Sequence, residues 1–422
     1  MEAYSLNRSV PLLAEADIVV IGGGPAGIAA SIAAARCGKK VIVAEHSGQL
    51  GGMGTLANVS VFMPVGNVTG IYREIVEETL PESLPDSHDT SIAPQYNPFL
   101  LRHYFNEKLE KENVKVLFHT TFISAVKERD RVTAVIVHTR EGLFALKAAV
   151  FIDGSGDGAV AIDAGADYTT GREEDGLTQP MTLMFMMQNT GKPVQRSLPE
   201  GCYTYSSVEE LPQGRHLYWE RNSDGTMLVN MTRVKGNGSK VEEVSFAEKE
   251  SLRQALSVAD YLQRNGFETY TLSHIPGQIG VRETNQIVGR YTLTEQDIVE
   301  GRRFADVVAQ TNYEIDIHSP DGKRGTDERR VDGYDIPYRC MIPAKVEGLL
   351  VAGRSISATH VAMSSMRVQA TCFALGQAAG IAASLSIDTH CPLPEVSMTE
   401  LHRELGKQGV RLLKEDEPVA SK

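Results

Sequence analysis

A glycine-rich turn between a short apolar strand and an alanine-rich helix constrains this chain most. Residues 16–21 (ADIVVI) are apolar and rich in β-branched side chains, which is typical of a buried parallel strand. They lead into Gly22-Gly23-Gly24-Pro25-Ala26-Gly27, which fits the pattern GxGxxG. Residues 28–37 follow as a predicted helix with Gly38 at its C-terminal end. This order of elements predicts half of a Rossmann-type nucleotide-binding fold.

Each part of this unit has a physical role in binding a dinucleotide. Gly22 permits the tight turn, and Gly27 lets helix and strand pack closely. Gly24, with Pro25 and Ala26 after it, lets a pyrophosphate approach the backbone at the positive end of the helix. A second predicted strand, residues 40–44, ends at Glu45, whose carboxylate can bind ribose hydroxyls and disfavours a 2′-phosphate. A GxGxxG pattern alone is a weak signal, and this unit does not separate FAD from NAD.

Three further segments indicate FAD. A second glycine cluster, residues 48–55 (GQLGGMGT), suits a backbone that lies flat against a long ligand. Alternating apolar residues predict a β-meander with strands at 114–118, 123–128, 132–138 and 143–148, followed by a buried strand at 149–152. Near the C-terminus, a strand at 348–351 precedes Gly353 and Arg354, and residues 366–384 predict a helix of small residues. Both chain ends therefore build one long cofactor site.

The length of 422 residues exceeds the roughly 250–300 that one core supports, so more than one domain is expected. We predict an α/β protein with a Rossmann-type FAD-binding domain, whose parallel sheet carries an inserted β-meander, and an α+β substrate domain. The FAD-binding domain spans residues 14–177 and 331–422, and the substrate or cap domain spans about 178–330.

Local patterns in the middle of the chain predict individual elements. The apolar run 181–188 (MTLMFMMQ) is a strand whose methionines more often fill core than line a pocket. Asn222-Ser223-Asp224-Gly225 indicates a hairpin, and residues 246–265 a helix with Ser245 as N-cap. Thr294 with Asp297 fits an N-terminal capping pattern for a helix that extends through Ala309.

Charge and cysteine usage exclude several classes of function. The net charge is −12, and the basic cluster Lys323–Arg324 with Arg329–Arg330 is interrupted by acidic residues, so nucleic acid is not an expected partner. The five cysteines are scattered without a CxxC pair, which argues against a metal site, a redox dithiol and an oxidising compartment. We expect a cytoplasmic protein without a signal peptide or membrane span, and the sequence does not indicate its oligomeric state.

The chain resembles the FAD-dependent oxidoreductases of the glutathione-reductase superfamily, and more specifically a family related to fumarate reductase and succinate dehydrogenase flavoproteins. The resemblance is carried by VIGGGPAGIAASIAAARCGKKVIVAE, GGMGT, FIDGSGDGAVA, RETNQIVGRYTLTEQDIVEGRRFADVVA, YEIDIH, IPYRCMIP and GLLVAGRSISATHVAMSSMRVQATCFALGQAAGIAA. It implies tightly bound FAD and redox turnover but no particular substrate. No segment aligns with the catalytic-arginine segment of the succinate and fumarate enzymes, which counts against a dicarboxylate.

The resemblance also assigns cofactor contacts. Gly22, Gly24 and Gly27 are expected beside the pyrophosphate, and Glu45 beside the ribose of the adenosine. The remaining contacts, expected along the ribityl chain, the flavin and its pyrimidine side, are Gly52, Met53, Thr55, Asp157, Gly353, Arg354 and Val368.

Four candidate catalytic residues lie in the later motifs, where hydride transfer would need a proton donor or acceptor and a neutralising charge. His360 lies between the predicted flavin strand and flavin helix, with a structural cap as the alternative. Arg367 is expected at a helix start, which is an unfavourable position for a positive charge. This favours a specific role for Arg367 over a simple ion pair. Arg282 follows a glycine-punctuated loop. His318 shares a strand face with Asp316, where an interdomain pair is the alternative to catalysis.

The leading hypothesis is a soluble FAD-dependent oxidoreductase that transfers hydride between flavin N5 and a small organic substrate. An NAD(P)H-linked flavoprotein reductase is the first alternative, and it is disfavoured because the chain has one complete GxGxxG–acid unit. The second alternative is an FAD-containing subunit of a redox or RNA-modifying complex. The missing cysteine clusters and the acidic balance count against it.

Overall fold

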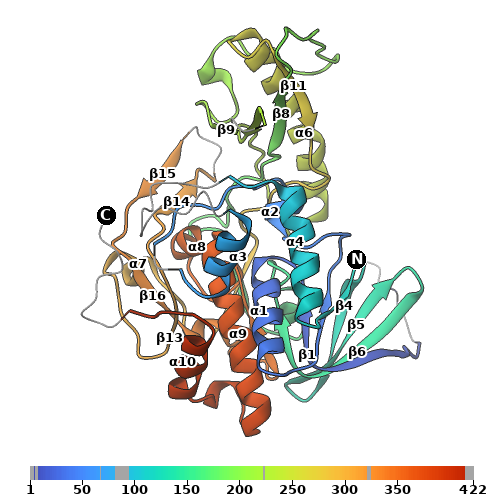
Figure 1. Ribbon diagram of the computed structural model, residues 1–422, viewed down its shortest axis with the longest axis vertical. Coiled ribbons are helices and arrows are strands. Elements are labelled where there is room, and N and C mark those ends of the chain that lie inside the picture. The colour runs from blue at the N-terminus through green and yellow to red at the C-terminus, as the bar shows by residue number, and fades with distance from the viewer. Residues whose placement is uncertain are drawn as a thin grey trace.

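The computed structural model describes residues 4, 8–66, 68–80, 95–221, 224–320 and 325–413. Figure 1 shows a larger body, in which α1 and α9 lie side by side, and a smaller cap at one end of the long axis that contains β8, β9, β11 and α6. Three sequence features fall wholly or partly outside the described residues. These are Asn222 and Ser223 of the predicted hairpin, Lys323–Arg324 of the basic cluster, and most of the first seven residues.

The strands are β1 (Leu12–Ile21), β2 (Val41–Ala44), β3 (Lys115–Leu117), β4 (Thr121–Glu128), β5 (Arg131–Thr139), β6 (Gly142–Asp153), β7 (Tyr168–Thr170), β8 (Phe185–Asn189), β9 (Tyr218–Arg221), β10 (Thr226–Val229), β11 (Tyr270–His274), β12 (Asn285–Ile287), β13 (Val307–Thr311), β14 (Ile315–His318), β15 (Thr326–Arg329), β16 (Tyr334–Pro337) and β17 (Leu349–Val351). The α-helices are α1 (Pro25–Arg36), α2 (Met53–Leu56), α3 (Ile71–Thr79), α4 (Pro98–Lys111), α5 (Ala159–Asp163), α6 (Val241–Arg264), α7 (Glu295–Val299), α8 (His360–Met366), α9 (Gln369–Thr389) and α10 (Met398–Lys407). Short 3₁₀ turns lie at Val208–Glu210, Tyr338–Met341 and Leu393–Glu395.

A mixed sheet of seven strands forms the centre of the body. Its order is β3-β2-β1-β6-β5-β4, and β17 also pairs with β6. β1, β2, β3, β6 and β17 are parallel to one another, whereas β4, β5 and β6 are antiparallel. The long strand β6 belongs to both parts, because residues 142–147 pair with β5 and residues 151–153 with β17. The predicted Rossmann-type sheet with an inserted meander is confirmed.

Two details of the predicted meander are wrong. The strand expected at 114–118 is β3, which pairs with β2 in parallel and belongs to the nucleotide-binding sheet. The strands expected at 143–148 and 149–152 form the single strand β6. The sequence suggested two strands because side chains alternate before about residue 149 and are apolar without interruption after it. In the structure this change occurs within β6, because its first part pairs with β5 and its last part with β17.

Helix α9 packs against α1 at two glycines. A Cβ on Gly376 would lie 2.0 Å from the carbonyl oxygen of Ala26, and a Cβ on Gly380 would lie 2.2 Å from that of Ala30. The small residues of this helix therefore serve its close packing against α1. The helix begins at Gln369, because Val368 has an extended backbone and α8 ends just before it.

Among the described residues, α9 alone is long and apolar enough to cross a membrane by length and composition. Its most apolar window is 89% buried inside the protein, as expected for a core helix packed between other elements.

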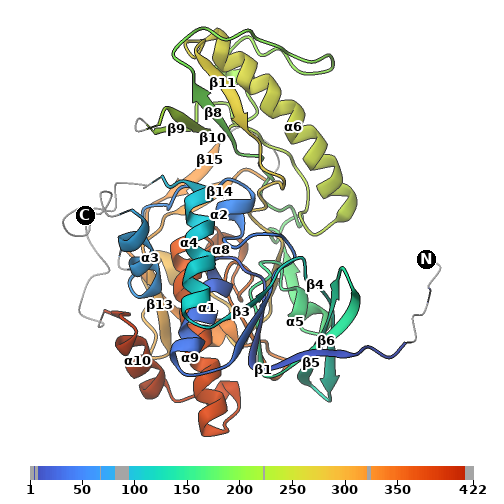
Figure 2. The ribbon, with the colours of Figure 1, turned by 45° about the vertical axis from the view of Figure 1, so that its right-hand side comes forward.

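The cap consists of the antiparallel sheet β11-β8-β10-β9 and the long helix α6, which Figure 2 shows alongside the sheet. Its core joins buried residues of β8 and β10, such as Phe185 and Met227, to Val258 and Leu262 of α6. The predicted N-cap is wrong, because α6 begins at Val241 and Ser245 lies inside it, with its hydroxyl donating to the Val241 carbonyl.

The helix expected between Thr294 and Ala309 is much shorter. The capping box of Thr294 and Asp297 is present, but α7 ends at Val299, and Gly301 has a φ of +62°. The chain then enters β13, which pairs with β16 and contacts α9 of the body. The cap sheet itself ends at His274, so the domain boundary placed near residue 330 stays a prediction.

Candidate flavin and substrate site

The glycine-rich turn forms a cradle at the N-terminus of α1. Gly24 is the N-cap, and no side chain caps the helix. A Cβ built on Gly24 would meet nothing nearer than the Gly52 Cα at 3.7 Å, so a methyl group would fit here without a clash. A Cβ on Gly52 would lie 2.9 Å from the Gly24 Cα, so the two glycine clusters lie against each other. This arrangement fits a bound pyrophosphate, because backbone N–H groups and the positive helix end are available at this turn.

The other two glycines of the motif fix the fold around the cradle. A Cβ on Gly27 would lie 1.9 Å from the Gly22 carbonyl oxygen, so Gly27 allows α1 to pack on the preceding turn. Gly27 does not line the cofactor cavity, and the geometry gives it a packing role. Gly22 has a φ of +99°, and a Cβ there would lie 2.5 Å from the Gly154 carbonyl oxygen. It lets the loop after β6 approach the turn.

Glu45 lies at the end of β2 with its carboxylate almost fully buried. One oxygen accepts from the Gly23 N–H at 2.6 Å and the other from the Ser47 N–H at 2.7 Å. Burial would raise the pKa of Glu45, but hydrogen bonds from His46 and Ser47 outweigh it and hold the pKa below its usual range. The carboxylate stays ionised and also lines the cavity, where it can accept hydrogen bonds from a ribose.

A cavity of about 460 Å³ runs from this cradle along the carboxyl ends of the parallel strands to the start of α9. Open α/β sheets place ligands at this edge. Ten of the thirteen expected cofactor residues line it, namely Gly22, Gly24, Pro25, Ala26, Glu45, Gly52, Met53, Asp157, Gly353 and Arg354. Thr55 does not, because its hydroxyl donates to the Leu50 carbonyl at 2.6 Å inside the glycine cluster.

Arg354 and Asp157 join two segments that are far apart in the sequence at this cavity. Arg354 Nη2 donates to Asp157 Oδ1 at 2.8 Å, and the Thr284 hydroxyl donates to the same oxygen at 2.9 Å. Because Arg354 follows β17 and Asp157 follows β6, the pair joins neighbouring strand ends. Residues from the N-terminal and the C-terminal parts of the chain thus line one cavity, in agreement with the prediction.

A second cavity, of about 310 Å³, lies between the body and the cap. It shares five lining residues with the first cavity, namely Met53, Val281, Arg354, Arg367 and Gln369. It contains three of the four expected catalytic residues, Arg282, His318 and Arg367, together with the last expected cofactor residue, Val368. The two cavities therefore adjoin around Arg367 and Gln369.

Arg367 stands at the junction, between two helices. It is the C-cap of α8, where a cation is favourable, and it directly precedes Val368, the N-cap of α9, so the argument from an unfavourable helix start applies only in part. Its Nη2 donates to Asp316 Oδ2 at 3.1 Å, to the Asp316 carbonyl at 3.2 Å and to Gln179 Oε1 at 3.4 Å. These contacts hold the guanidinium between the two cavities.

Arg282 lies on the wall of the second cavity beside the cap. Its Nη1 donates to the Pro180 carbonyl at 2.8 Å and to the Thr182 hydroxyl at 2.6 Å. Burial lowers the pKa of Arg282, and the positive charge of Arg367 lowers it further. This cation is held mainly by neutral oxygens.

His318 is 7% exposed and lies beside Asp316, with 3.6 Å between its Nε2 and Asp316 Oδ1. The predicted Asp–His pair on β14 is therefore present. Its Nδ1 has no hydrogen-bond partner among the described residues. Burial lowers the pKa of His318 well below its usual value, and the charges of Arg282 and Arg233 add to this effect. The ring is therefore neutral at pH 7.

His360 lines neither of these two cavities. Its Nδ1 lies 2.7 Å from Glu283 Oε1, and both side chains are buried. Its position between β17 and α9 in the sequence suggested a flavin contact. The fold turns the ring toward the segment after β11, so the geometry favours the structural alternative.

Comparison with known families decides the class of this protein. A profile of the FAD dependent oxidoreductase family matches residues 17–405, which is most of the chain. The chain belongs to this family. FAD is therefore its cofactor, and the glycine cradle, the buried Glu45 and the long cavity at the strand ends are where this FAD dependent oxidoreductase has room for it.

Individual relatives are distant. A segment of 83 residues is 36% identical to a 4-oxocyclohex-2-ene-1-carboxylate 5-dehydrogenase of Sinomonas cyclohexanicum, and it covers 19% of this chain and 14% of that enzyme. A geranylgeranyl bacteriochlorophyll reductase-like protein from Thermoplasma acidophilum has a TM-score of 0.49 at 11% identity, with 94% of this chain and 84% of that one covered. An anhydrotetracycline hydroxylase from Streptomyces rimosus has a TM-score of 0.48 at 12% identity, with 93% and 66% covered.

Several lining residues of this oxidoreductase escaped the sequence patterns. In the flavin cavity they include His46, in the loop after β2, Thr121, at the start of β4, and Gln369, at the start of α9, none of which belongs to a distinct motif. In the second cavity they include Thr182, Trp219 and Tyr313. Trp219 is the single tryptophan of the chain, and Tyr313 begins the segment YEIDIH, so both carried a signal that could have been used.

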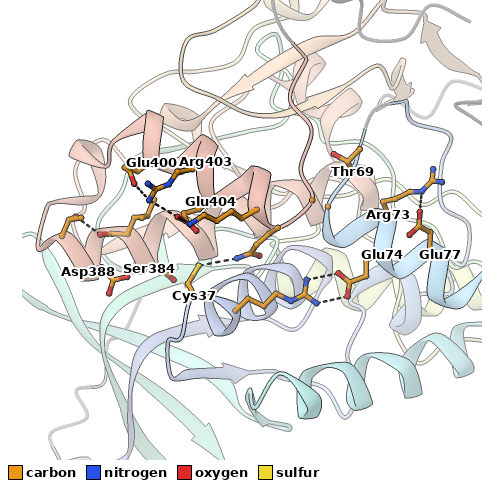
Figure 3. Close-up of a pocket in the computed structure, with 17 residues that line it drawn as sticks. Cys37, Thr69, Arg73, Glu74, Glu77, Ser384, Asp388, Glu400, Arg403 and Glu404 are labelled. Atoms are coloured by element: carbon orange, nitrogen blue, oxygen red, sulfur yellow. Dashed lines mark hydrogen bonds and ion pairs between the residues drawn. The ribbon is translucent and has the colours of Figure 1, made fainter.

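A wider cavity of about 940 Å³ lies at the opposite end of α1 from Gly24, bordered by α3, α9 and α10. Figure 3 shows that its charged side chains pair with one another. Arg36 binds Glu74, Arg73 binds Glu77, and Arg403 binds both Glu400 and Glu404. Mutually neutralised surface charges of this kind do not indicate a binding site.

Proposed function

We propose that this enzyme transfers hydride between flavin N5 and a small organic substrate that binds in the second cavity. The observation that carries the proposal is the junction of the two cavities. One fits a dinucleotide, the other is large enough for a small molecule, and they share Arg354, Arg367 and Gln369. When bound, FAD supplies the two-electron acceptor or donor of the reaction.

The protein residues divide between holding the cofactor and preparing the substrate. Gly24 and Gly52 would hold the pyrophosphate, Glu45 the ribose, and Arg354 the part nearest the substrate cavity. No side chain caps α9, so its first N–H groups and positive end can stabilise negative charge beside Gln369. The Gln369 amide is fixed by donating to the Val59 and Val61 carbonyls, at 2.8 Å and 3.2 Å.

His318 is the proposed proton acceptor. It lines the second cavity and is neutral at pH 7, so its imidazole ring can accept a proton that the substrate loses with the hydride. Asp316, beside the ring, would stabilise the imidazolium that results. The dehydrogenase named among the relatives supports redox chemistry on an organic substrate, although its match covers a short segment.

The topology of the sheet also supports a place in the glutathione-reductase superfamily, which we include in the proposal. In that arrangement an antiparallel meander is inserted before the chain returns through the parallel sheet, as β4, β5 and β6 do here.

Sulfite provides a test that needs no knowledge of the substrate, because it adds to accessible flavin N5 and bleaches the visible flavin absorption. We expect sulfite to bleach the FAD-loaded enzyme, and Arg367→Gln to weaken sulfite binding about tenfold or more, which is about 1.4 kcal/mol. Full resistance to sulfite would contradict an N5 that faces the second cavity. Rapid anaerobic bleaching by NADH alone would instead favour the NAD(P)H-linked alternative.

A further inference from the structure

We infer that the substrate carries one carboxylate on an apolar body, and that the carboxylate binds beside Arg282. This inference rests on the proposed function, because it concerns the occupant of the same cavity. Four features lead to it, namely the Arg282 guanidinium on the cavity wall, its link through Thr182 to Arg233, which does not line this cavity, the pairing of the other lining arginines with carboxylates, and the apolar remainder of the wall.

Two arginines converge on one hydroxyl group. Arg282 Nη1 donates to Thr182 Oγ1 at 2.6 Å, and Arg233 Nη1 donates to the same oxygen at 3.0 Å. Thr182 Oγ1 in turn donates its own proton to the Thr232 carbonyl at 3.0 Å. The hydroxyl is therefore fully used, and two like charges are held close together with a neutral oxygen between them.

Neither arginine of this pair has a carboxylate partner among the described residues. Besides Thr182, Arg282 donates to the Pro180 carbonyl. Arg233 donates to the Thr232 carbonyl and to both oxygens of Asn230, while its Nε and Nη2 have no partner among the described residues. Burial lowers the pKa of both groups, and Arg282 lowers that of Arg233 further, as expected for cations that lack an anion.

The other three arginines that line the cavity each form an ion pair with a carboxylate. Arg367 pairs with Asp316, Arg354 with Asp157, and Arg215 with Glu328. A further carboxyl, that of Glu314, also lines the cavity, but among the described residues no ion pair joins it to Arg282 or Arg233. The unbalanced charge is thus positive and concentrated at Arg282 and Arg233. One carboxylate beside Arg282 would offset part of it, and Arg guanidinium groups bind carboxylates in a planar, bidentate manner.

The rest of the wall is apolar. Val59, Val61, Met184, Leu217 and Trp219 line the cavity beside the arginines. Such a surface favours a hydrophobic body. Among the described residues that line this cavity, Arg282 is the one cation without an ion pair, so a second carboxylate would find no partner here. Within about 310 Å³, the arrangement fits a compact monocarboxylic acid better than a dicarboxylic acid or an inorganic anion.

Benzoate is a suitable probe, with benzamide as its neutral isostere, and calorimetric titration of the FAD-loaded enzyme measures both without any redox step. We expect benzoate to bind at least about tenfold more tightly than benzamide, succinate and inorganic phosphate. In Arg282→Gln, benzoate binding should weaken about tenfold to a hundredfold, while benzamide binding stays unchanged. The matched control is Arg339→Gln, because Arg339 pairs with Asp306 on the surface away from both cavities.

The outcomes separate this inference from the proposed function. Equal affinity for benzoate and benzamide in the unmodified enzyme would overturn the inference without any variant, even if Arg282→Gln failed to fold. Tighter binding of succinate or phosphate would overturn the choice of a monocarboxylate. Benzoate binding that depends on Arg282 in an enzyme whose flavin resists sulfite would uphold the anion site and reject the proposed place of N5.

Discussion

His360 Nδ1 lies 2.7 Å from Glu283 Oε1, with the histidine side chain 7% exposed and the glutamate fully buried. The second oxygen of Glu283 accepts from the Gln179 N–H at 2.8 Å, and Gln179 Oε1 accepts from the His318 N–H at 3.2 Å and from Arg367. The His360–Glu283 pair is therefore connected through Gln179 to His318 and Arg367, two residues that line the substrate cavity.

Removing His360 should cost stability more than catalytic rate. His360→Ala leaves a buried carboxylate without its partner, and we expect the free energy of unfolding to fall by about 3–5 kcal/mol. The folded fraction should keep its FAD and its sensitivity to sulfite. Urea unfolding and sulfite titration measure these two properties. A variant with wild-type stability and impaired flavin chemistry would restore the catalytic interpretation.

Gly24 and Gly27 should respond differently to the same methyl group. Gly24 has φ −77° and ψ −176°, and its Cβ would meet no atom nearer than 3.7 Å, so Gly24→Ala should fold normally and lose FAD affinity about tenfold or more. Gly27→Ala would clash with the Gly22 carbonyl and should lower stability by about 1–3 kcal/mol or more. Fluorescence titration of the apoprotein with FAD and thermal unfolding separate the two effects. Normal FAD affinity in Gly24→Ala would contradict the proposed cradle.

The contact between α9 and α1 offers a second matched pair. Gly376→Ala and Gly380→Ala would each clash with a carbonyl of α1, and each should lower stability by about 1–3 kcal/mol. Ala26, the residue opposite Gly376, lines the flavin cavity, whereas Ala30, opposite Gly380, does not. FAD affinity, measured by titration of the apoproteins, should therefore fall more in Gly376→Ala. Equal affinities would show that strain at this contact does not reach the cofactor site.

His318 should make the protein less stable in acid. Burial holds its pKa well below 6.5 in the folded protein. The charges of Arg282, Arg233, Arg367 and Arg215 also oppose protonation, whereas nearby Asp316 favours it. The unfolded chain, with a pKa near 6.5, then binds a proton that the folded protein does not. Stability falls as pH drops below 6.5, by about 1.4 kcal/mol per pH unit from this group. His318→Gln should remove that part of the slope in urea unfolding between pH 6.5 and 5. An unchanged slope would place the acid sensitivity elsewhere.

The parts of the fold that local pattern determines were predictable. The strand, glycine turn and helix at residues 16–37 have their periodicity and breakers within one short segment, and the structure places α1 at Pro25–Arg36. The helix expected through Ala309 fails because β13 is stabilised by its pairing with β16, a distant partner that a local pattern does not contain. Helix α8 was not predicted, and the helix expected at residues 366–384 begins at Gln369, because its serine, valine and histidine residues give the segment of α8 little helix propensity.

The substrate cavity could be predicted only in pieces. Arg282, His318 and Arg367 were singled out by residue type and neighbouring motifs, and the structure brings them together. Thr182, whose hydroxyl links Arg282 to Arg233, belongs to a segment that read only as a buried strand. The excess positive charge arises from contacts between segments far apart in the sequence, so composition and spacing did not reveal it.

The most direct test of this account is an experimental structure of the enzyme with FAD bound. We predict that the pyrophosphate lies against Gly24 and Gly52 and that the isoalloxazine ring lies at the junction of the two cavities, with N5 facing the side of Arg282 and Arg367. A ring directed into solvent, or an N5 closed off from the second cavity by protein, would contradict the proposed function.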